Sequence, residues 1–213
     1  MQSALLRDDA FCHQCHSLLQ PITKADLQGT VSEWQESTAR KEGLSCQKCH
    51  MPLVGEGDEK HHFHGHYYPG RNPLPGRRSL SIEEIAKNPG FISVTVKNHV
   101  PAHYLPTGAS FKAVFLEVKG FGETGQDPQF EDTFVFIKRF KFKNPIGLKD
   151  VPWTVAMDTR LKPEEERTIT FETEKAEFLH RVVATIRCAF VGDFGFDPEW
   201  WTSDYIFEKE VVF

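Results

Sequence analysis

The 213-residue sequence lacks a long hydrophobic run, and no stretch approaches the roughly 18 apolar residues that a membrane-spanning helix needs. It also lacks an excess of positive charge, because 25 Lys and Arg stand against 30 Asp and Glu and give a formal net charge of −5. That balance argues against general nucleic-acid binding. No internal repeat and no low-complexity tract is found. We therefore expect no membrane span, no nucleic-acid partner and no solenoid.

The first ninety residues have few aliphatic and β-branched residues and cannot build a large hydrophobic core. They are rich in His and Cys instead: seven of the ten His and four of the five Cys precede residue 70. A segment of this size with so little apolar content usually needs a disulfide, a metal or a cofactor to fold. The positions of these His and Cys residues therefore decide the class of protein.

The two parts of the chain predict different secondary structure. In residues 1–90 we expect short helices over residues 4–11 and 25–41. A third is expected from Ser81, which forms a capping-box pattern with Glu84 before Asn88-Pro89-Gly90 ends the helix. Residues 67–78 contain three Pro and two Gly and read as a linker or wrapped loop.

The second part alternates apolar and polar residues with the period of β-strands. Strands are predicted over residues 91–97, 111–118, 133–137, 167–172, 181–190 and 206–213, with residues 158–172 forming a turn that leads into an outer strand. The prediction is an α+β chain. A loop and helix domain over residues 1–90 has few strands, and an antiparallel, immunoglobulin-like β-sandwich follows over residues 91–213.

Two copies of the pattern C-x-x-C-H lie in the first part, at residues 12–16 (CHQCH) and 46–50 (CQKCH). Two thiols at this spacing can add to the two vinyl groups of a haem, and the His that follows can coordinate its iron. The pattern is the attachment signal of a c-type haem. It predicts two covalent haem c groups. The residues that would hold them are Cys12, Cys15, His16, Cys46, Cys49 and His50.

Other uses of these cysteines were weighed. A four-cysteine zinc site would leave an inter-pair gap longer than the usual ribbon spacing of roughly 15–20 residues, and it leaves the two following His unexplained. A redox thiol pair would be expected after a strand in a βαβ unit, which neither copy has. Disulfides are the third alternative. The remaining Cys188 lies in a predicted strand and is interpreted as a small buried residue.

His16 and His50 would be the proximal iron ligands, so each iron needs a second axial ligand. Only three Met are present, and Met51 adjoins its own proximal His, so bis-histidine ligation is favoured. The candidate second ligands are His61, His62, His64, His66, His99 and His103. Spacing does not choose among the first four. His13, inside the first motif, is expected to point to solvent.

Three segments resemble multihaem c-type cytochromes related to the cytochrome c554 group. Residues 34–52 (WQESTARKEGLSCQKCHMP) resemble a W-x-x-S-x-H-A … C-x-x-C-H-M-P stretch of that group. Residues 61–65 (HHFHG) resemble its H-x-F-x-G element, and residues 98–108 (NHVPAHYLPTG) resemble the N-x-x-A-G-H-x-L-P-T-G element that opens a β-sandwich. The resemblance implies that His61 and His103 are distal ligands.

The sequence also departs from the pattern of that group. The His of that pattern would fall near Thr38, where this sequence has none, Ala102 replaces a Gly, and two attachment motifs are present where relatives have four or more. The missing His leaves room for a five-coordinate iron or for a ligand supplied by another subunit.

We expect an exported dihaem cytochrome that passes single electrons between redox partner proteins, which include other multihaem cytochromes or further copies of itself. An enzyme or sensor with one open iron position, acting on a small nitrogen or oxygen species, is the alternative, as is a subunit of a cytochrome filament. An electron-transfer protein is favoured over an enzyme. Because haem c is attached outside the bacterial cytoplasm, a periplasmic or extracellular location is predicted. Residues 1–20 lack the features of a signal peptide, so the leader is expected to have been removed.

Overall fold

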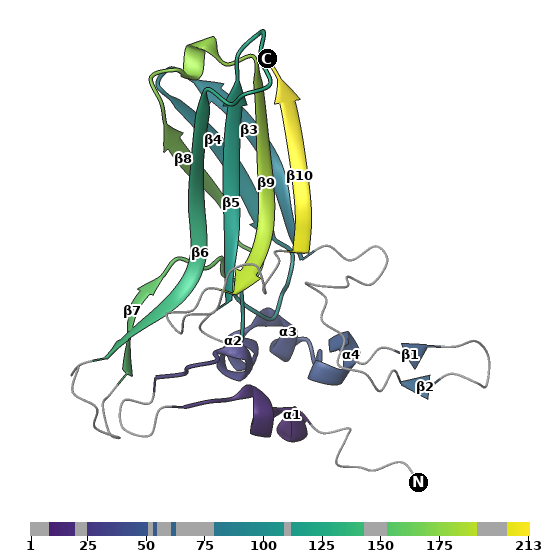
Figure 1. Ribbon diagram of the computed structural model, residues 1–213. Coiled ribbons are helices and arrows are strands. Elements are labelled where there is room, and N and C mark those ends of the chain that lie inside the picture. Colours follow the sequence, from purple (N-terminus) through teal and green to yellow (C-terminus); the bar gives the residue numbers. More distant parts are fainter. Residues whose placement is uncertain are drawn as a thin grey trace.

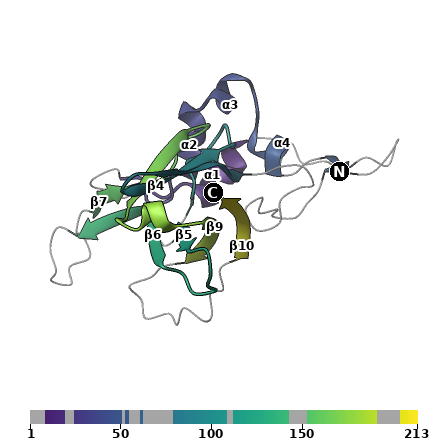
Figure 2. The same ribbon diagram turned by 90° about the horizontal axis from the view of Figure 1, so that it is seen from above.

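A computed structural model of the protein describes residues 9–19, 25–50, 53–54, 61–62, 79–108, 112–142, 153–190 and 204–213. Most of its β-strands stand side by side as one tall unit, and the helices of the first part gather beneath the lower end of that unit (Figure 1). Seen from above, helices α2 (Thr30–Glu36), α3 (Thr38–Lys41) and α4 (Cys46–His50) lie on one side of the strands, away from strands β6 (Phe130–Phe142) and β10 (Asp204–Val212) (Figure 2). The predicted linker over residues 67–78 and the predicted ligands His64 and His66 lie outside the described residues.

Four short helices form the first part: α1 (Asp9–His16), α2 (Thr30–Glu36), α3 (Thr38–Lys41) and α4 (Cys46–His50). The single helix predicted over residues 25–41 is divided at Ser37, whose φ of −79° and ψ of 165° are extended. The Ser37 hydroxyl accepts a hydrogen bond from the Arg40 backbone N–H and so caps α3. Every helix in the described part of the chain is too short and too polar to cross a membrane.

A two-stranded hairpin follows the second C-x-x-C-H motif. Strands β1 (Leu53–Val54) and β2 (His61–His62) are antiparallel, and Leu53 pairs with His62. His61 and His62 therefore belong to a strand that pairs with residues just beyond the second motif.

Two antiparallel sheets form the rest of the chain. The first has the order β3-β4-β8 and the second the order β10-β9-β5-β6-β7. The strands are β3 (Leu80–Asn88), β4 (Phe91–Asn98), β5 (Lys112–Phe121), β6 (Phe130–Phe142), β7 (Trp153–Asp158), β8 (Glu166–Glu172), β9 (Arg181–Phe190) and β10 (Asp204–Val212), with a 3-10 helix, η3 (Ala176–Phe178), before β9. The six predicted strands are confirmed, and β8 is the edge strand that the sequence predicts. The α+β class is confirmed as well.

The main core lies between the two sheets, which face each other (Figure 1). Alternate residues of β4, namely Ile92, Val94 and Val96, are fully buried, as period-two alternation predicts. They pack in the same cluster as Leu116 of β5 and Val182 of β9. The buried apolar residues of this core all lie from Leu80 onward, and helices α1 to α4 contribute none of them.

The helix predicted from Ser81 is wrong, because residues 80–88 form strand β3. Asn88 pairs with Phe91 across a tight turn in which Gly90 has a φ of +83°. Leu80, Ser81, Ile82 and Ile85 are buried against the sheet, and pairing with β4 outweighs the local capping pattern. The sheet therefore begins at Leu80, and a division at residue 90 passes through the β3–β4 hairpin.

Candidate haem site

The two C-x-x-C-H motifs, far apart in the sequence, lie against each other on helices α1 and α4. The Cys46 backbone N–H donates a hydrogen bond of 2.8 Å to Asp9 Oδ1, so the first turn of α1 caps the start of α4. The thiols of Cys12 and Cys46 are hydrogen-bonded to each other. All six residues that the motifs assign to haem attachment therefore lie on two neighbouring helices.

The structure does not favour the alternative uses of the cysteines. None of the five cysteines is in a disulfide, and the described residues contain no group of three or more His, Cys, Asp or Glu that could hold a metal ion. Burial raises the pKa of the Cys46 thiol, and Asp9 raises it further. Burial also raises the pKa of Cys12. A redox thiol needs the opposite shift, so neither zinc binding nor thiol chemistry is favoured.

His103 lies in the loop between β4 and β5, which Asn98 fixes to the sheet. The fully buried Asn98 side chain donates hydrogen bonds of 2.9 Å to the His103 carbonyl and 2.8 Å to the Lys162 carbonyl. Its Oδ1 accepts a hydrogen bond of 2.9 Å from the Val100 N–H. One amide side chain thus holds both sides of the loop at the end of β4.

The loop brings the His103 ring close to the His50 ring. Their centroids lie 6.3 Å apart and their planes are tilted by 40°. A ligand nitrogen lies about 2.0–2.1 Å from its metal ion and about 1.1 Å from the centre of its own ring, so two axial imidazoles on one ion have centroids roughly 6.3 Å apart. The observed separation matches this distance.

The state of His103 also suits a metal ligand. Its Nδ1 is buried and has no hydrogen-bond partner. Burial, and then the charge of His50, lower the pKa of His103 to about 4. The ring is therefore neutral at pH 7, which is the form that binds a metal. The unpartnered nitrogen, the facing His50 ring and the thiols of α4 together fit a c-type haem.

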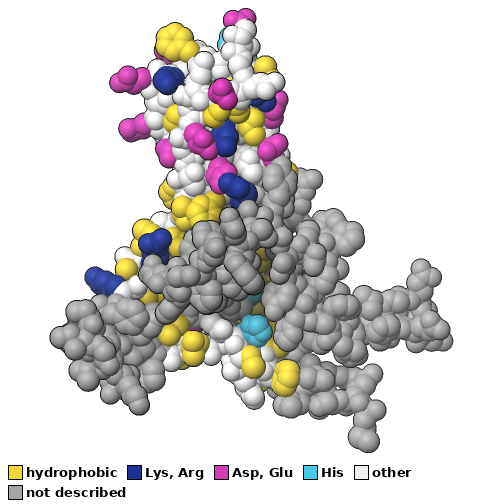
Figure 3. Space-filling model, viewed as in Figure 1, with side chains coloured by type: hydrophobic (Ala, Val, Ile, Leu, Met, Phe, Trp, Pro, Cys, Tyr) yellow, Lys and Arg dark blue, Asp and Glu magenta, His cyan; other side chains and the backbone are white. Residues whose placement is uncertain are grey.

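Large apolar side chains are exposed beside the first motif. Phe11 is 42% exposed, and Leu18 and Leu19 are each 53% exposed. In the space-filling view, a histidine lies among apolar side chains near the helices, whereas charged side chains cover the upper part of the same face (Figure 3). Such a patch indicates that an apolar group covers it, as a porphyrin does.

The other candidate distal ligands differ in how they are placed. The Nε2 of His99 is 2.6 Å from Ser81 Oγ and 3.5 Å from Glu83 Oε1, so this exposed His is engaged within the β3–β4 sheet. His61 and His62 are described only as residues of β2. The choice between them, and of His64 and His66, therefore stays a prediction.

The expectation that His13 points to solvent is wrong. Its ring packs edge-on against Trp34 with centroids 5.8 Å apart, and its Nε2 is buried. The reason is that α1 packs against α2, which carries Trp34. Trp34 belongs to a second, small core with Ala39 and Ala102, between the helices and the His103 loop.

Sequence reasoning missed a buried ion pair next to this loop. Arg160 Nη1 donates a hydrogen bond of 2.6 Å to Glu33 Oε1, and the two side chains are only 5% and 6% exposed. The residues are 127 positions apart. Charged residues in a sequence are by default expected at the surface, so no local signal marks this pair.

Thr38, near which the resembling cytochromes have a His, also lies beside the His103 loop. Its hydroxyl is 3.4 Å from the Pro101 carbonyl and 3.1 Å from Glu164 Oε2. A threonine hydroxyl does not replace a histidine as an iron ligand, so this position contributes a contact between α3 and the loop instead.

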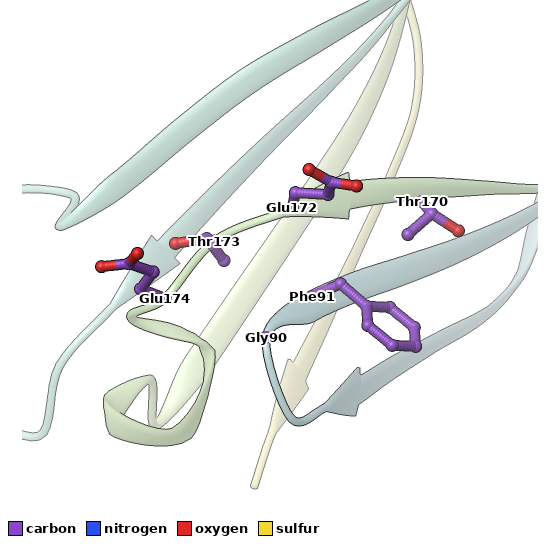
Figure 4. Close-up of a pocket in the computed structure, with 6 residues that line it drawn as sticks. All are labelled: Gly90, Phe91, Thr170, Glu172, Thr173 and Glu174. Carbon is purple, nitrogen blue, oxygen red and sulfur yellow. The ribbon is translucent and has the colours of Figure 1, made fainter.

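A shallow hollow lies at the opposite end of the sheets, far from the helices (Figure 4). The residues that line it are Gly90, Phe91, Thr170, Glu172, Thr173 and Glu174. It offers no His or Cys and is separate from the haem site.

Gly29 allows the Glu33 side chain to reach its partners. It has a φ of +80°, and a Cβ added there would lie 2.4 Å from Glu33 Oε1, which Arg160 holds in place. Replacing Gly29 with Ala should lower the free energy of unfolding by about 2–4 kcal/mol, from backbone strain and the displaced carboxylate. Urea unfolding measures this. Gly43→Ala is the matched control, since its φ is +72° with nothing near the added Cβ. Equal losses in the two variants would contradict the prediction.

Comparison with known proteins finds no family model and no curated protein that matches the sequence. Among solved structures, the chain is similar to a penta-haem cytochrome c552 from Thermochromatium tepidum, with a TM-score of 0.75 and 20% sequence identity. The similarity covers 98% of this chain and 56% of that one, so the chain spans little more than half the length of that protein. At this identity the similarity concerns the fold alone. The helices and paired sheets of the chain are arranged as in that penta-haem cytochrome.

Proposed function

We propose that the protein is a c-type cytochrome that passes single electrons between redox partner proteins through two covalently bound haems. The observation that carries the proposal is the His50–His103 pair, with ring centroids 6.3 Å apart. His50 is the last residue of the second of two C-x-x-C-H motifs, which lie on the neighbouring helices α1 and α4. Cys12 and Cys15 would hold one haem, and Cys46 and Cys49 the other. The fold shared with a penta-haem cytochrome supports this class of cofactor.

The axial ligands we propose are His16 and His50 on the proximal sides and His103 opposite His50. For the haem of the first motif, His61 is the first candidate, with His62, His64, His66 and His99 as alternatives. A haem c bound in this way supplies a one-electron iron couple, and two histidine ligands set a lower potential than a His/Met pair. The chain's own part is to keep His103 neutral, buried and facing His50.

The two haems we propose would be held close together. The thiols of Cys12 and Cys46 are in contact, and the charges of both His50 and His16 act on His103. The motifs therefore place both proximal ligands near one distal ligand. Short separations between redox groups favour electron transfer, and the positioning of cofactors is the contribution that such a protein makes.

We further propose that the β-rich part is an immunoglobulin-like β-sandwich. Strands β3 to β10 can be lettered in chain order as A, B, C, C′, C″, E, F and G. One sheet then has the order A-B-E, and the second has the order G-F-C-C′-C″. The second order is that of a variable-type domain. We propose an exported protein, periplasmic or extracellular, whose partners are redox proteins, including other multihaem cytochromes or further copies of itself.

A second candidate is a haem enzyme or sensor with one open iron position for a small nitrogen or oxygen species. The lack of a His near Thr38 favours it, because the resembling cytochromes have a His there, and the Thr38 hydroxyl, bonded to its neighbours, offers no ligand. Carbon monoxide distinguishes the two functions. It binds a reduced iron with an open position and leaves a bis-histidine iron unchanged.

Replacing His103 with Ala should convert one haem from low spin to high spin and make it reactive toward carbon monoxide. The variant is made in a host that attaches haem c, and its absorption spectrum is recorded oxidised, reduced, and reduced with carbon monoxide. His180→Ala is the control, because this exposed histidine lies directly before β9 and is not among the candidate ligands. A His103→Ala protein with both haems still low spin would refute the ligand assignment.

A further inference from the structure

We propose that Glu33 is a positioning residue for the distal ligand: it fixes the loop that carries His103, and Arg160 holds Glu33 in place. The inference rests on the proposed function, since it takes His103 to be an iron ligand. It assigns a role to two residues that touch neither the cysteines nor the proximal histidines of the site.

The Glu33 carboxylate reaches from helix α2 into the His103 loop. Its Oε2 accepts a hydrogen bond of 3.2 Å from the Tyr104 backbone N–H, the residue directly after His103, and one of 2.8 Å from the Thr107 hydroxyl. Its Oε1 accepts a bond of 2.6 Å from Arg160. Each oxygen of this buried group is thus used, and two of the three donors belong to the loop.

Arg160 holds the carboxylate and the loop from the side of the β-sheets. Its guanidinium is paired with Asp158 through two hydrogen bonds of 2.8 Å. It lies over the Tyr104 ring, 4.8 Å from the centroid, and donates to the Pro106 carbonyl at 3.3 Å. Although burial acts against the charge, Asp158 and Glu33 raise the pKa of Arg160. The guanidinium is therefore a permanent charge that contacts the loop at two residues.

These contacts make the position of His103 depend on how the helices pack against the β-rich part. Glu33 lies in the helical part that carries the cysteines, whereas Arg160 and His103 come from the β-rich part. The hydroxyls of Thr30 and Thr107, 3.2 Å apart, join the same two parts. A buried carboxylate left with fewer donors is strongly destabilised. The loop and α2 therefore keep one relative position, and His103 is held facing His50.

The test compares Glu33→Gln and Thr107→Val with a matched ion-pair variant elsewhere. Glu117→Gln removes the carboxylate that pairs with Arg187 between β5 and β9, away from the loop. In haem-loaded protein we expect Glu33→Gln to raise the fraction of haem that binds carbon monoxide about tenfold, and Thr107→Val to raise it less. Hydrogen exchange of the Tyr104 amide, a measurement independent of haem, should become faster in Glu33→Gln. Glu117→Gln should change neither.

Each outcome separates the inference from the proposed function. If His103→Ala exposes a haem to carbon monoxide but Glu33→Gln and Thr107→Val do not, the positioning role is refuted and the cytochrome assignment stands. If His103→Ala itself has no effect, the ligand assignment fails and the inference fails with it. Where Glu33→Gln does not fold, Thr107→Val and Glu33→Asp take its place, and unchanged spectra in both refute the role.

Discussion

Replacing Cys46 and Cys49 together with Ser should reduce the number of covalently bound haems from two to one. The matching change at Cys12 and Cys15 should do the same, and the fourfold variant should carry none. The reason is that thioether bonds need thiol sulfur, which the hydroxyl of Ser does not replace. Mass spectrometry of the denatured protein counts attached haems directly, because only covalent groups survive denaturation.

Cys188→Ser is the matched control for these variants. Cys188 is a partly buried residue of β9, outside both motifs, and the haem count should stay at two. We also expect the fourfold variant to lose structure in the helical part, since that part contributes only the small core around Trp34. A wild-type protein that binds zinc with these four thiols and carries no haem would overturn the proposed function.

The cysteine motifs and most strands can be predicted from the sequence because each depends on a short, local pattern of residues. The C-x-x-C-H motif predicts haem attachment from five residues alone. The alternation of apolar and polar residues in β4 and β9 arises because one face of each strand is buried. The α+β class follows from these two signals. Strand β3 was missed because a capping pattern at Ser81 mimics a helix start. Strand β7 lies at the edge of its sheet, and its apolar residues Val155 and Met157 are 46% and 42% exposed. Its apolar residues therefore do not mark a buried face from which the strand could be predicted.

The parts of the site that depend on distant contacts could not be derived from spacing. His50 and His103 are 53 positions apart, and only a resemblance to multihaem cytochromes singled out His103 among the histidines. Nothing in either local sequence links Glu33 with Arg160, whose pairing exists only after the helices dock on the sheets. Helix α2 also begins at Thr30, later than its predicted start, because the Asp26 carboxylate accepts hydrogen bonds from the backbone of Gln28 and Gly29 and so forms a turn there.

Replacing Arg160 with Met should lower the free energy of unfolding by about 3–5 kcal/mol, the usual cost of leaving one partner of a buried ion pair alone. The Glu33 carboxylate, 6% exposed, would keep Tyr104 and Thr107 as donors and lose its counter-charge. Urea unfolding of haem-loaded protein, followed by tryptophan fluorescence, measures the loss. The double variant with Glu33→Leu should recover part of the stability, because the buried Glu33 charge is then no longer left without its partner.

The pH dependence of this loss follows from Asp158. Burial raises its pKa, but the hydrogen bonds and charge of Arg160 outweigh burial and leave the pKa below the ordinary value of 3.8. A carboxylate with a lowered folded pKa stabilises the protein above its unfolded pKa, and this contribution is lost as the pH falls through the folded pKa. Wild type should therefore lose this contribution below about pH 4. Arg160→Met already lacks it, and the stability difference between them should narrow there.

An exposed ion pair provides the comparison that separates burial from charge. Lys97 and Glu166 are 3.3 Å apart on β4 and β8, with side chains 37% and 53% exposed. Lys97→Met should cost no more than about 1 kcal/mol, because water screens the pair. If Arg160→Met lowers the free energy of unfolding as little as Lys97→Met does at neutral pH, the Glu33–Arg160 pair does not join the helices to the sheets as its geometry indicates. A large loss for Arg160→Met alone, reduced in the double variant, is the result that a buried pair at this junction requires.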